Sequence, residues 1–229
     1  MIERAQNLLI DADDTLWENN IYYERVIREV LALLEKTGAD ASRFRAVLDE
    51  TERQRIPFSG YGTVNFTRSL VDTFRRFLPA DADPVLPEKV EQLSLAILRH
   101  PVEIFPEVPE TLEYLSGRHM LYLVTKGDLQ EQERKISDSN LRGYFLGVEI
   151  LAEKNSQAYS MLLERLRLNP IRTWMIGNSP RSDINPALAA GMSAVFIPHE
   201  HTWTLENEES MSHPGLIELH AFSDLRRRF

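Results

Sequence analysis

The sequence predicts an α/β fold in which a mainly parallel sheet is flanked by helices and interrupted by a helical insertion. Three observations favour this fold class. Short apolar runs that end abruptly at polar residues recur along the chain. Segments with helical spacing lie between the later runs. The stretch from about residue 19 to residue 100, in contrast, shows helical spacing only.

The composition is that of an ordinary globular protein: 229 residues, 43% hydrophobic and 27% charged, with a formal net charge of −9. This acidic balance argues against nonspecific binding to nucleic acid or anionic membranes, which requires a basic field. The absence of cysteine excludes disulfides, thiolate metal sites and cysteine nucleophiles. No signal sequence is evident, and no apolar stretch approaches the roughly 18 residues of a membrane helix. We therefore expect a cytoplasmic protein.

Each predicted strand is a short apolar run. The first, Asn7–Ile10, is continuous and stops at acidic residues, which is typical of a buried strand. The other predicted strands are residues 119–124, 147–151, 173–176 and 194–197. Helical segments between the later strands predict parallel pairing, because parallel neighbours need a crossover connection. One such helix is expected to begin after Asp128, which forms a capping-box sequence with Glu131.

The insertion follows the first strand and contains no convincing strand of its own. Its predicted amphipathic helices are residues 26–35, 44–53, 64–78 and 90–98. We expect a core formed by residues 1–16 and 104–229, a helical cap domain formed by residues 17–103, and a sheet that resumes near Phe105.

Polar side chains follow the apolar runs. They are Asp11 and Asp13 after the first, Thr125 and Lys126 after the second, Lys154 after the third, and Asn178 and Asp183 after the fourth. The carboxyl ends of parallel strands meet at one edge of a sheet, where ligands bind. We therefore expect these side chains to converge.

Such a group of side chains has the composition of a phosphoryl-transfer site. Two carboxylates and an amide or acid oxygen suit Mg²⁺, which prefers oxygen ligands. Thr125 offers a hydroxyl and Lys154 a positive charge, which together can hold a phosphoryl group. One carboxylate can attack phosphorus while a second carboxyl group transfers the proton.

The motifs and their order resemble those of the haloacid dehalogenase-like (HAD) hydrolase superfamily, specifically phosphatases with a helical cap inserted after the first motif. Leu8–Leu16 resembles the first motif, Asp-x-Asp-x-Thr after a hydrophobic strand. Thr125 matches the second motif and Lys154 the third, and Gly177–Asp183 resembles the acidic fourth motif. The resemblance implies a Rossmann-like core and an Mg²⁺ cofactor.

The resemblance also implies a role for each aspartate of the first motif. Asp11 would be the nucleophile, and its carboxylate would also touch Mg²⁺. Asp13 would protonate the leaving alkoxide and then deprotonate the hydrolytic water, while its backbone carbonyl ligates the metal. Asp11 and Asp13 are thus expected to act as a catalytic pair.

The other motif residues are expected to bind substrate and metal. By resemblance, Thr125 and Lys154 hold phosphoryl oxygens, with Lys126 beside them in the substrate site. Asn178 and Asp183 would complete or orient the metal shell. Asn178 replaces the acidic residue that begins the family's fourth motif, so we expect weaker metal binding or a greater dependence on Asp183.

The predicted function is hydrolysis of a small phosphorylated metabolite, because an enclosed site under a cap disfavours large polymers. Asp14, where the family commonly has glycine, adds a charge but leaves the catalytic pair intact.

One alternative function is that of a 2-haloacid dehalogenase, although the dehalogenases of the family lack the second aspartate. Another is a non-catalytic phosphate-binding or regulatory relative. His199 and His201 are interpreted as surface-loop residues rather than as metal ligands.

Overall fold

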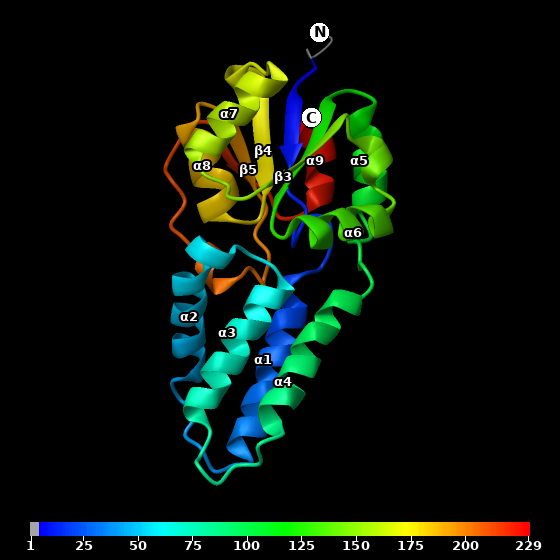
Figure 1. Ribbon diagram of the computed structural model, residues 1–229. Coiled ribbons are helices and arrows are strands. Elements are labelled where there is room, and N and C mark those ends of the chain that lie inside the picture. Colours follow the sequence, from blue (N-terminus) through cyan, green and yellow to red (C-terminus); the bar gives the residue numbers. More distant parts are fainter. Residues whose placement is uncertain (1–4) are drawn as a thin grey trace. The chain divides into compact units, whose positions relative to one another are not determined.

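The protein, described by a computed structural model over residues 5–229, forms two compact units (Figure 1). One unit combines the chain up to Glu18 with Val102–Phe229, and the other is Asn19–Pro101. The first contains a six-stranded parallel sheet flanked by helices, which confirms the predicted fold class. Within residues 5–229, no helix is both long enough and apolar enough to cross a membrane.

The sheet has the order β3-β2-β1-β4-β5-β6, and every neighbouring pair is parallel. Its strands are β1 (Asn7–Ile10), β2 (Met120–Lys126), β3 (Gly147–Leu151), β4 (Thr173–Gly177), β5 (Ser193–Phe196) and β6 (Leu216–Glu218). The first strand therefore lies between β2 and β4, and the loops that follow these three strands leave the same edge of the sheet.

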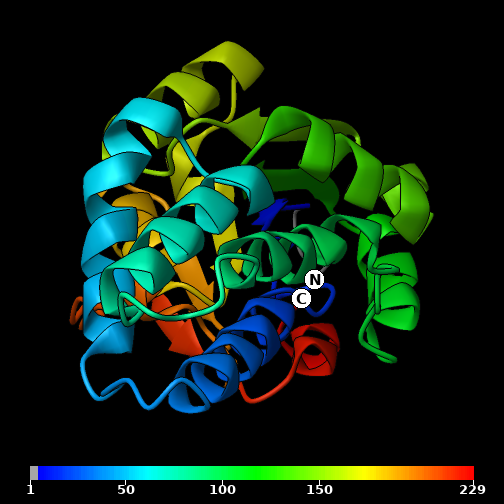
Figure 2. The ribbon, with the colours of Figure 1, turned by 60° about the horizontal axis from the view of Figure 1, so that its bottom comes forward.

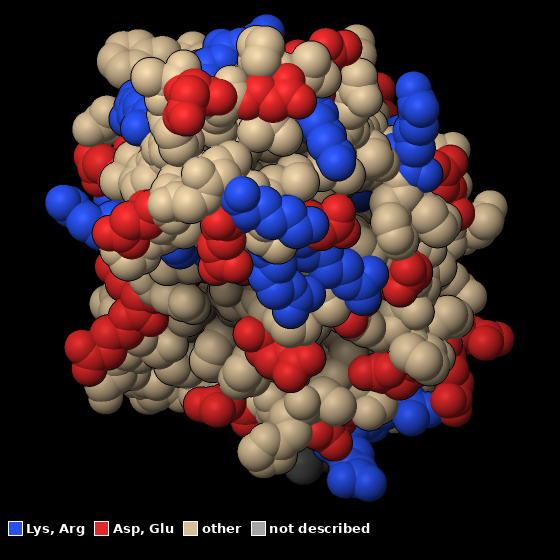
Figure 3. Space-filling view, turned by 90° about the horizontal axis from the view of Figure 1, so that it is seen from below, with Lys and Arg blue, Asp and Glu red and all other residues tan. Residues whose placement is uncertain are grey.

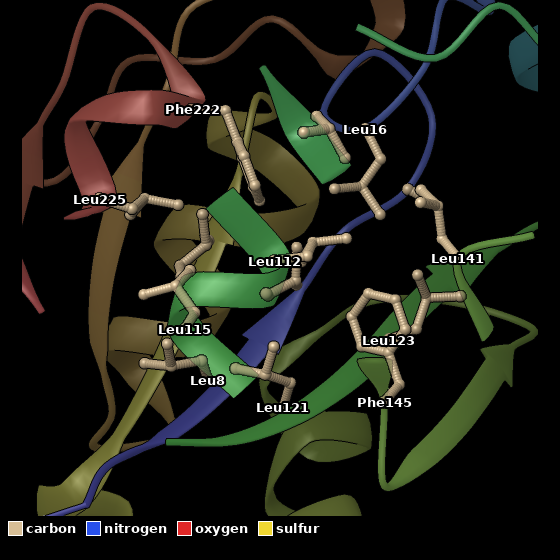
Figure 4. Close-up of a cluster of buried hydrophobic side chains, with 14 of the residues drawn as sticks. Leu8, Leu16, Leu112, Leu115, Leu121, Leu123, Leu141, Phe145, Phe222 and Leu225 are labelled. Carbon is tan, nitrogen blue, oxygen red and sulfur yellow. The ribbon is translucent and has the colours of Figure 1, made fainter. Parts of the chain in front are cut away.

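The side chains of the central strand β1 alternate between the two faces of the sheet, and they are buried on both faces. Leu8 and Ile10 belong to an apolar cluster that includes Leu112 and Leu115, part of which is shown in Figure 4. Leu9 belongs to a separate cluster with Tyr159 and Leu162 on the opposite face. A continuous apolar run, rather than an alternating one, is what a strand covered by helices on both faces requires.

The helices of the sheet-containing unit are α5 (Val108–Ser116), α6 (Leu129–Ser139), α7 (Ser156–Leu166), α8 (Asn185–Ala189) and α9 (Leu225–Arg228). Short helical turns lie at Arg142–Tyr144, Pro170–Arg172, Pro180–Ile184, Thr204–Glu206 and Phe222–Asp224. The predicted start of α6 is confirmed, since Asp128 Oδ1 accepts a hydrogen bond of 3.0 Å from the backbone N–H of Glu131.

The expected resumption of the sheet near Phe105 is wrong. The chain first forms α5, and the sheet resumes only at Met120. Val108, Leu112 and Leu115 have the spacing of one helical face and are fully buried, and Pro109 occupies the first turn, where proline is tolerated. The edge strand β6 and the helix α9 were also not expected from the sequence, because both are very short.

The helical unit consists of α1 (Asn20–Glu35), α2 (Phe44–Ser59), α3 (Thr63–Phe77), α4 (Leu86–Leu95) and a short turn at Ala96–Arg99. These helices pack along one another around their own apolar core (Figure 2). Val30, Leu48, Leu70 and Phe74 are among its fully buried side chains. Separate cores explain why the chain divides into two units.

Charged side chains of both signs are exposed on the protein surface. Figure 3 shows a face on which Lys and Arg gather near the middle, with Asp and Glu around them.

In the helical unit, Arg45 pairs with Glu24 and Asp49 at 2.7 and 2.8 Å. Near them, Glu52 is only 7% exposed, and burial, reinforced by the Asp49 charge, raises the pKa of Glu52 from 4.5 to about 8.

We expect the Glu52→Gln substitution to stabilise the protein increasingly as the pH rises. The folded protein keeps a proton on Glu52 that the unfolded chain releases above about pH 4.5, so the free energy of unfolding falls as the pH rises towards 8. Glutamine removes this loss, which amounts to roughly 1.4 kcal/mol per pH unit at most. Urea unfolding at pH 5, 7 and 9 measures the difference. The matched variant Glu50→Gln, at an exposed position of the same helix, should show no comparable trend.

Candidate active site

The loops that follow β1, β2, β3 and β4 bring together most of the residues that the sequence singled out. The centre of the group is Lys154. Its Nζ donates hydrogen bonds of 2.5 Å to Asp11 Oδ1 and 2.7 Å to Asp183 Oδ1. All three side chains are almost fully buried, so two carboxylates share one ammonium out of contact with bulk water.

The titration behaviour of this group follows from its burial. Burial and the neighbouring Asp183 carboxylate raise the pKa of Asp11 to about 7, against the opposing effect of Lys154. Burial alone would lower the pKa of Lys154, but the Asp11 and Asp183 carboxylates raise it well above its usual value. The ammonium therefore stays charged, and the site has one negative charge in excess when both carboxylates are ionised.

Thr15 connects Asp11 to Asn178. Its hydroxyl is 3.0 Å from Asp11 Oδ2 and 3.3 Å from Asn178 Oδ1, so a single hydroxyl lies beside both oxygens. The Asn178 amide nitrogen donates to Thr202 Oγ1, which leaves the amide oxygen directed towards Thr15. The oxygens of Asp11, Asn178 and Asp183 are of the kind that a hard divalent cation prefers, and the two carboxylates carry one negative charge more than Lys154 offsets.

Asp13 lies in a separate set of hydrogen bonds. Asp13 Oδ1 accepts a hydrogen bond of 2.7 Å from Trp17 Nε1. Lys135 Nζ lies 2.6 Å from Asp13 Oδ1 and 2.7 Å from Asp13 Oδ2. Gln132 Nε2 donates to Asp13 Oδ2 at 3.1 Å and to Thr125 Oγ1 at 2.6 Å. The second aspartate and the hydroxyl of the second motif are therefore joined through one buried amide. The Asp13 carboxylate is 22% exposed, compared with 9% for Asp11.

The side chain of Lys126 contacts residues that were not predicted to belong to the site. Its Nζ lies 2.6 Å from Glu206 Oε1, 2.7 Å from Ser182 Oγ and 3.5 Å from Glu153 Oε1. Burial would raise the pKa of Glu206, but the Lys126 ammonium and hydroxyl donors, including that of Ser179, hold it below its usual value. A direct role of Lys126 towards substrate stays a prediction.

A further polar cluster contains Asp14, Glu18 and His199. The two ring nitrogens of His199 lie 3.8 Å from Asp14 Oδ1 and 3.5 Å from Glu18 Oε2. His199 lies in a loop, and its side chain is 16% exposed, so it is partly buried beside these carboxylates. Burial lowers the pKa of His199. Asp14 has a φ of 59°, a left-handed conformation that is most easily adopted by glycine.

Three residues of the site were not assigned a role from the sequence. Thr15 belongs to the first motif, which was its only signal. Gln132 and Lys135 lie three positions apart on α6, so they share one helix face just beyond the capped start of that helix. This spacing is compatible with any amphipathic helix and does not reveal Asp13 as their partner.

Gly177 permits the position of Asp183. A Cβ on Gly177 would lie 2.2 Å from Asp183 Oδ2 and 2.4 Å from its Cγ. The π-type turn Pro180–Ile184 folds Asp183 back so that Oδ2 accepts a hydrogen bond from the backbone N–H of Ser179 at 3.0 Å. The side chain thereby lies directly against the glycine, where no other residue fits.

We expect Gly177→Ala to lower turnover roughly 100-fold, because Asp183 must move and Lys154 loses one of its two carboxylate partners. Steady-state turnover, with the melting temperature as a check of folding, measures the effect. The matched control is Gly143→Ala, since a Cβ on Gly143 meets no atom within 4 Å. Equal activity of the two variants would show that the position of Asp183 is unimportant.

Comparisons with known proteins agree on one family. The model of the haloacid dehalogenase-like hydrolase family matches residues 6–191. The phosphoglycolate phosphatase of Aquifex aeolicus is 29% identical over 175 residues, which cover 72% of this chain and 82% of that protein.

Solved structures show the same relationship. A haloacid dehalogenase-like family hydrolase from Xanthomonas campestris is 30% identical, with a TM-score of 0.86 over 98% of this chain and 90% of its own. The 2-haloacid dehalogenase of Pseudomonas syringae pv. Tomato DC3000 shares the fold at 23% identity, with a TM-score of 0.60 and 97% of each chain covered. The HAD-hydrolase YfnB of Bacillus subtilis also shares the fold, at 16% identity and a TM-score of 0.69 over 99% of each chain.

Proposed function

The chain belongs to the haloacid dehalogenase-like hydrolase family, and we propose that this enzyme is an Mg²⁺-dependent phosphatase that hydrolyses a small phosphomonoester through an aspartyl-phosphate on Asp11. The observation that carries the proposal is the environment of Asp13. Its carboxylate is oriented by Trp17, Lys135 and Gln132, and Gln132 also holds the Thr125 hydroxyl. A reaction at carbon with a halide leaving group has no use for such an oriented acid, whereas an alkoxide leaving group needs one.

The proposed reaction has two displacements. An Asp11 carboxylate oxygen attacks phosphorus, the bond from phosphorus to the ester oxygen breaks, and protonated Asp13 gives its proton to the departing oxygen. Asp13, now a carboxylate, then takes a proton from a water molecule that attacks the same phosphorus. The bond from phosphorus to Asp11 breaks, inorganic phosphate leaves, and both aspartates return to their first state.

The remaining side chains of the site would bind the phosphoryl group and Mg²⁺ and orient Asp11. Thr125 would donate its hydroxyl hydrogen to a phosphoryl oxygen, and Lys154 would hold a second one while keeping Asp11 in place. The oxygens of Asp11, Asn178 and Asp183 and the carbonyl of Asp13 would hold Mg²⁺. The ion would polarise the phosphoryl oxygens and offset their repulsion from Asp11.

We assign to the helical unit, Asn19–Pro101, the role of a cap that contributes to substrate selection. Its support is its position in the chain, inserted directly after the first motif, and its separate core. Residues that select the leaving group of the substrate would then come from a part of the chain that can vary without disturbing the sheet.

A substrate panel tests the function. Phosphomonoesters, phosphoglycolate among them, are assayed with and without Mg²⁺ alongside a 2-haloacid, and released phosphate or halide is measured. We expect Mg²⁺-dependent release of phosphate and no release of halide. Halide release would favour the dehalogenase alternative. No turnover of any compound, with phosphate still binding, would favour the non-catalytic one.

We expect Asn178→Asp to lower the Mg²⁺ concentration needed for half-maximal activity, roughly tenfold, because a carboxylate replaces a neutral amide in the donor set. The Mg²⁺ dependence of turnover measures this directly. The substitution Asn207→Asp, at an exposed position, serves as the control for added charge. An unchanged or higher Mg²⁺ concentration for half-maximal activity would contradict a metal ligand at position 178.

A further inference from the structure

We propose that Lys135, assisted by Gln132, is a positioning residue for Asp13, an assignment that rests on the proposed phosphatase function. The Lys135 ammonium lies within 2.7 Å of both Asp13 oxygens, and its side chain is 14% exposed. A cation that contacts both oxygens fixes the plane of the carboxyl group.

The orientation of the Asp13 carboxyl group matters in both displacements. As the bond from phosphorus to the ester oxygen is cleaved, Asp13 gives its proton to that oxygen and becomes a carboxylate. Lys135, by fixing the plane of the carboxyl group, keeps it directed towards the ester oxygen while the proton is transferred. In the second displacement the same contact keeps the carboxylate of Asp13 directed towards the attacking water.

Gln132 links this arrangement to the phosphoryl site. Its amide nitrogen donates to Asp13 Oδ2 and to the oxygen of the Thr125 hydroxyl. Since that hydroxyl oxygen is already an acceptor for Gln132, its single hydrogen is available to a phosphoryl oxygen. The amide thus sets the position of Asp13 relative to the group that would bind the substrate.

Helix α6 holds both residues rigidly. Its first turn is capped by Asp128, and Ile136, next to Lys135, is buried in the apolar cluster shown in part in Figure 4. Gln132 is itself only 2% exposed. Side chains on a capped and packed helix are held more precisely than side chains on a loop.

The test compares leaving groups, because a good leaving group needs little help from an acid. Single-turnover release of alcohol from the fastest alkyl phosphomonoester of the panel is compared with release of p-nitrophenol from p-nitrophenyl phosphate. For Lys135→Met we expect a fall of roughly 10- to 100-fold with the alkyl ester and less than about 3-fold with the aryl ester. KM should change little, and Lys135→Arg should restore most of the alkyl rate.

Matched variants complete the test. Arg134→Met, which removes an exposed cation from the same helix, should leave both rates unchanged. If Lys135→Met does not fold, Lys135→Gln, which retains an N–H donor without the charge, should show the same preference for the aryl ester. An equal fall with the two esters, or an effect on KM alone, would overturn the positioning role. Failure of the wild-type enzyme to hydrolyse either ester would instead refute the proposed function.

Discussion

Asp11→Asn should lower phosphatase turnover by roughly four orders of magnitude or more while the protein still folds. An amide cannot attack phosphorus as a carboxylate does, so no aspartyl-phosphate forms. The charge balance favours folding of the variant, because the ammonium of Lys154 is then paired with Asp183 alone and the excess negative charge disappears. We therefore expect a melting temperature without Mg²⁺ that is equal to or higher than that of the wild type.

Two measurements separate loss of chemistry from loss of structure. Turnover of the best phosphomonoester reports the chemistry, and thermal unfolding reports the fold. The control Asp81→Asn makes the same substitution at an exposed position and should change neither. Near-normal turnover of Asp11→Asn would eliminate Asp11 as the nucleophile, and with it the aspartyl-phosphate on Asp11.

Lys154→Met should cause the largest loss of stability together with a strong loss of activity. Removing the ammonium leaves the buried carboxylates of Asp11 and Asp183 without their shared cation. Breaking a buried ion pair in this way typically costs about 3–5 kcal/mol. The loss should be greater above pH 7 than below it, because Asp11, whose pKa is already raised to about 7, is ionised there.

Added Mg²⁺ provides the internal check on this prediction. A divalent cation can replace the missing positive charge, so we expect Mg²⁺ to restore part of the stability of Lys154→Met but little of its turnover. Chemical unfolding at pH 6 and pH 8, with and without Mg²⁺, measures both effects. Lys89→Met, which removes an exposed lysine, is the control. Stability equal to that of the wild type at pH 8 would show that the three side chains are not electrostatically coupled.

The sequence by itself determined the class of fold and the main members of the site. Apolar runs such as Asn7–Ile10 are local features, and the parallel arrangement follows from the helices between them. Once the strands are parallel, residues that follow them must lie at one edge, so Asp11, Lys154 and Asp183 are found in contact. Their roles in catalysis stay predictions, which the variants above test.

Local patterns were insufficient where elements are short or irregular. The helix α5 was not predicted, although its one proline, Pro109, lies in the first turn, where proline is well tolerated. The strand β6 has three residues, too few for any periodicity to be recognised. In both cases the element is stabilised by the part of the sheet that it packs against or pairs with.

Only the tertiary structure decided the partners of the charged side chains. Lys135 and Asp13 are 122 residues apart, and Lys126 and Glu206 are 80 residues apart. Neither pairing has a sequence signature, because a lysine on a helix or at a strand end has many accessible acidic partners before the chain folds. The same holds for Glu52, whose raised pKa reflects burial between helices rather than its place in the sequence. Sequence patterns specify local structure, whereas the environment of a charge depends on every segment that packs around it.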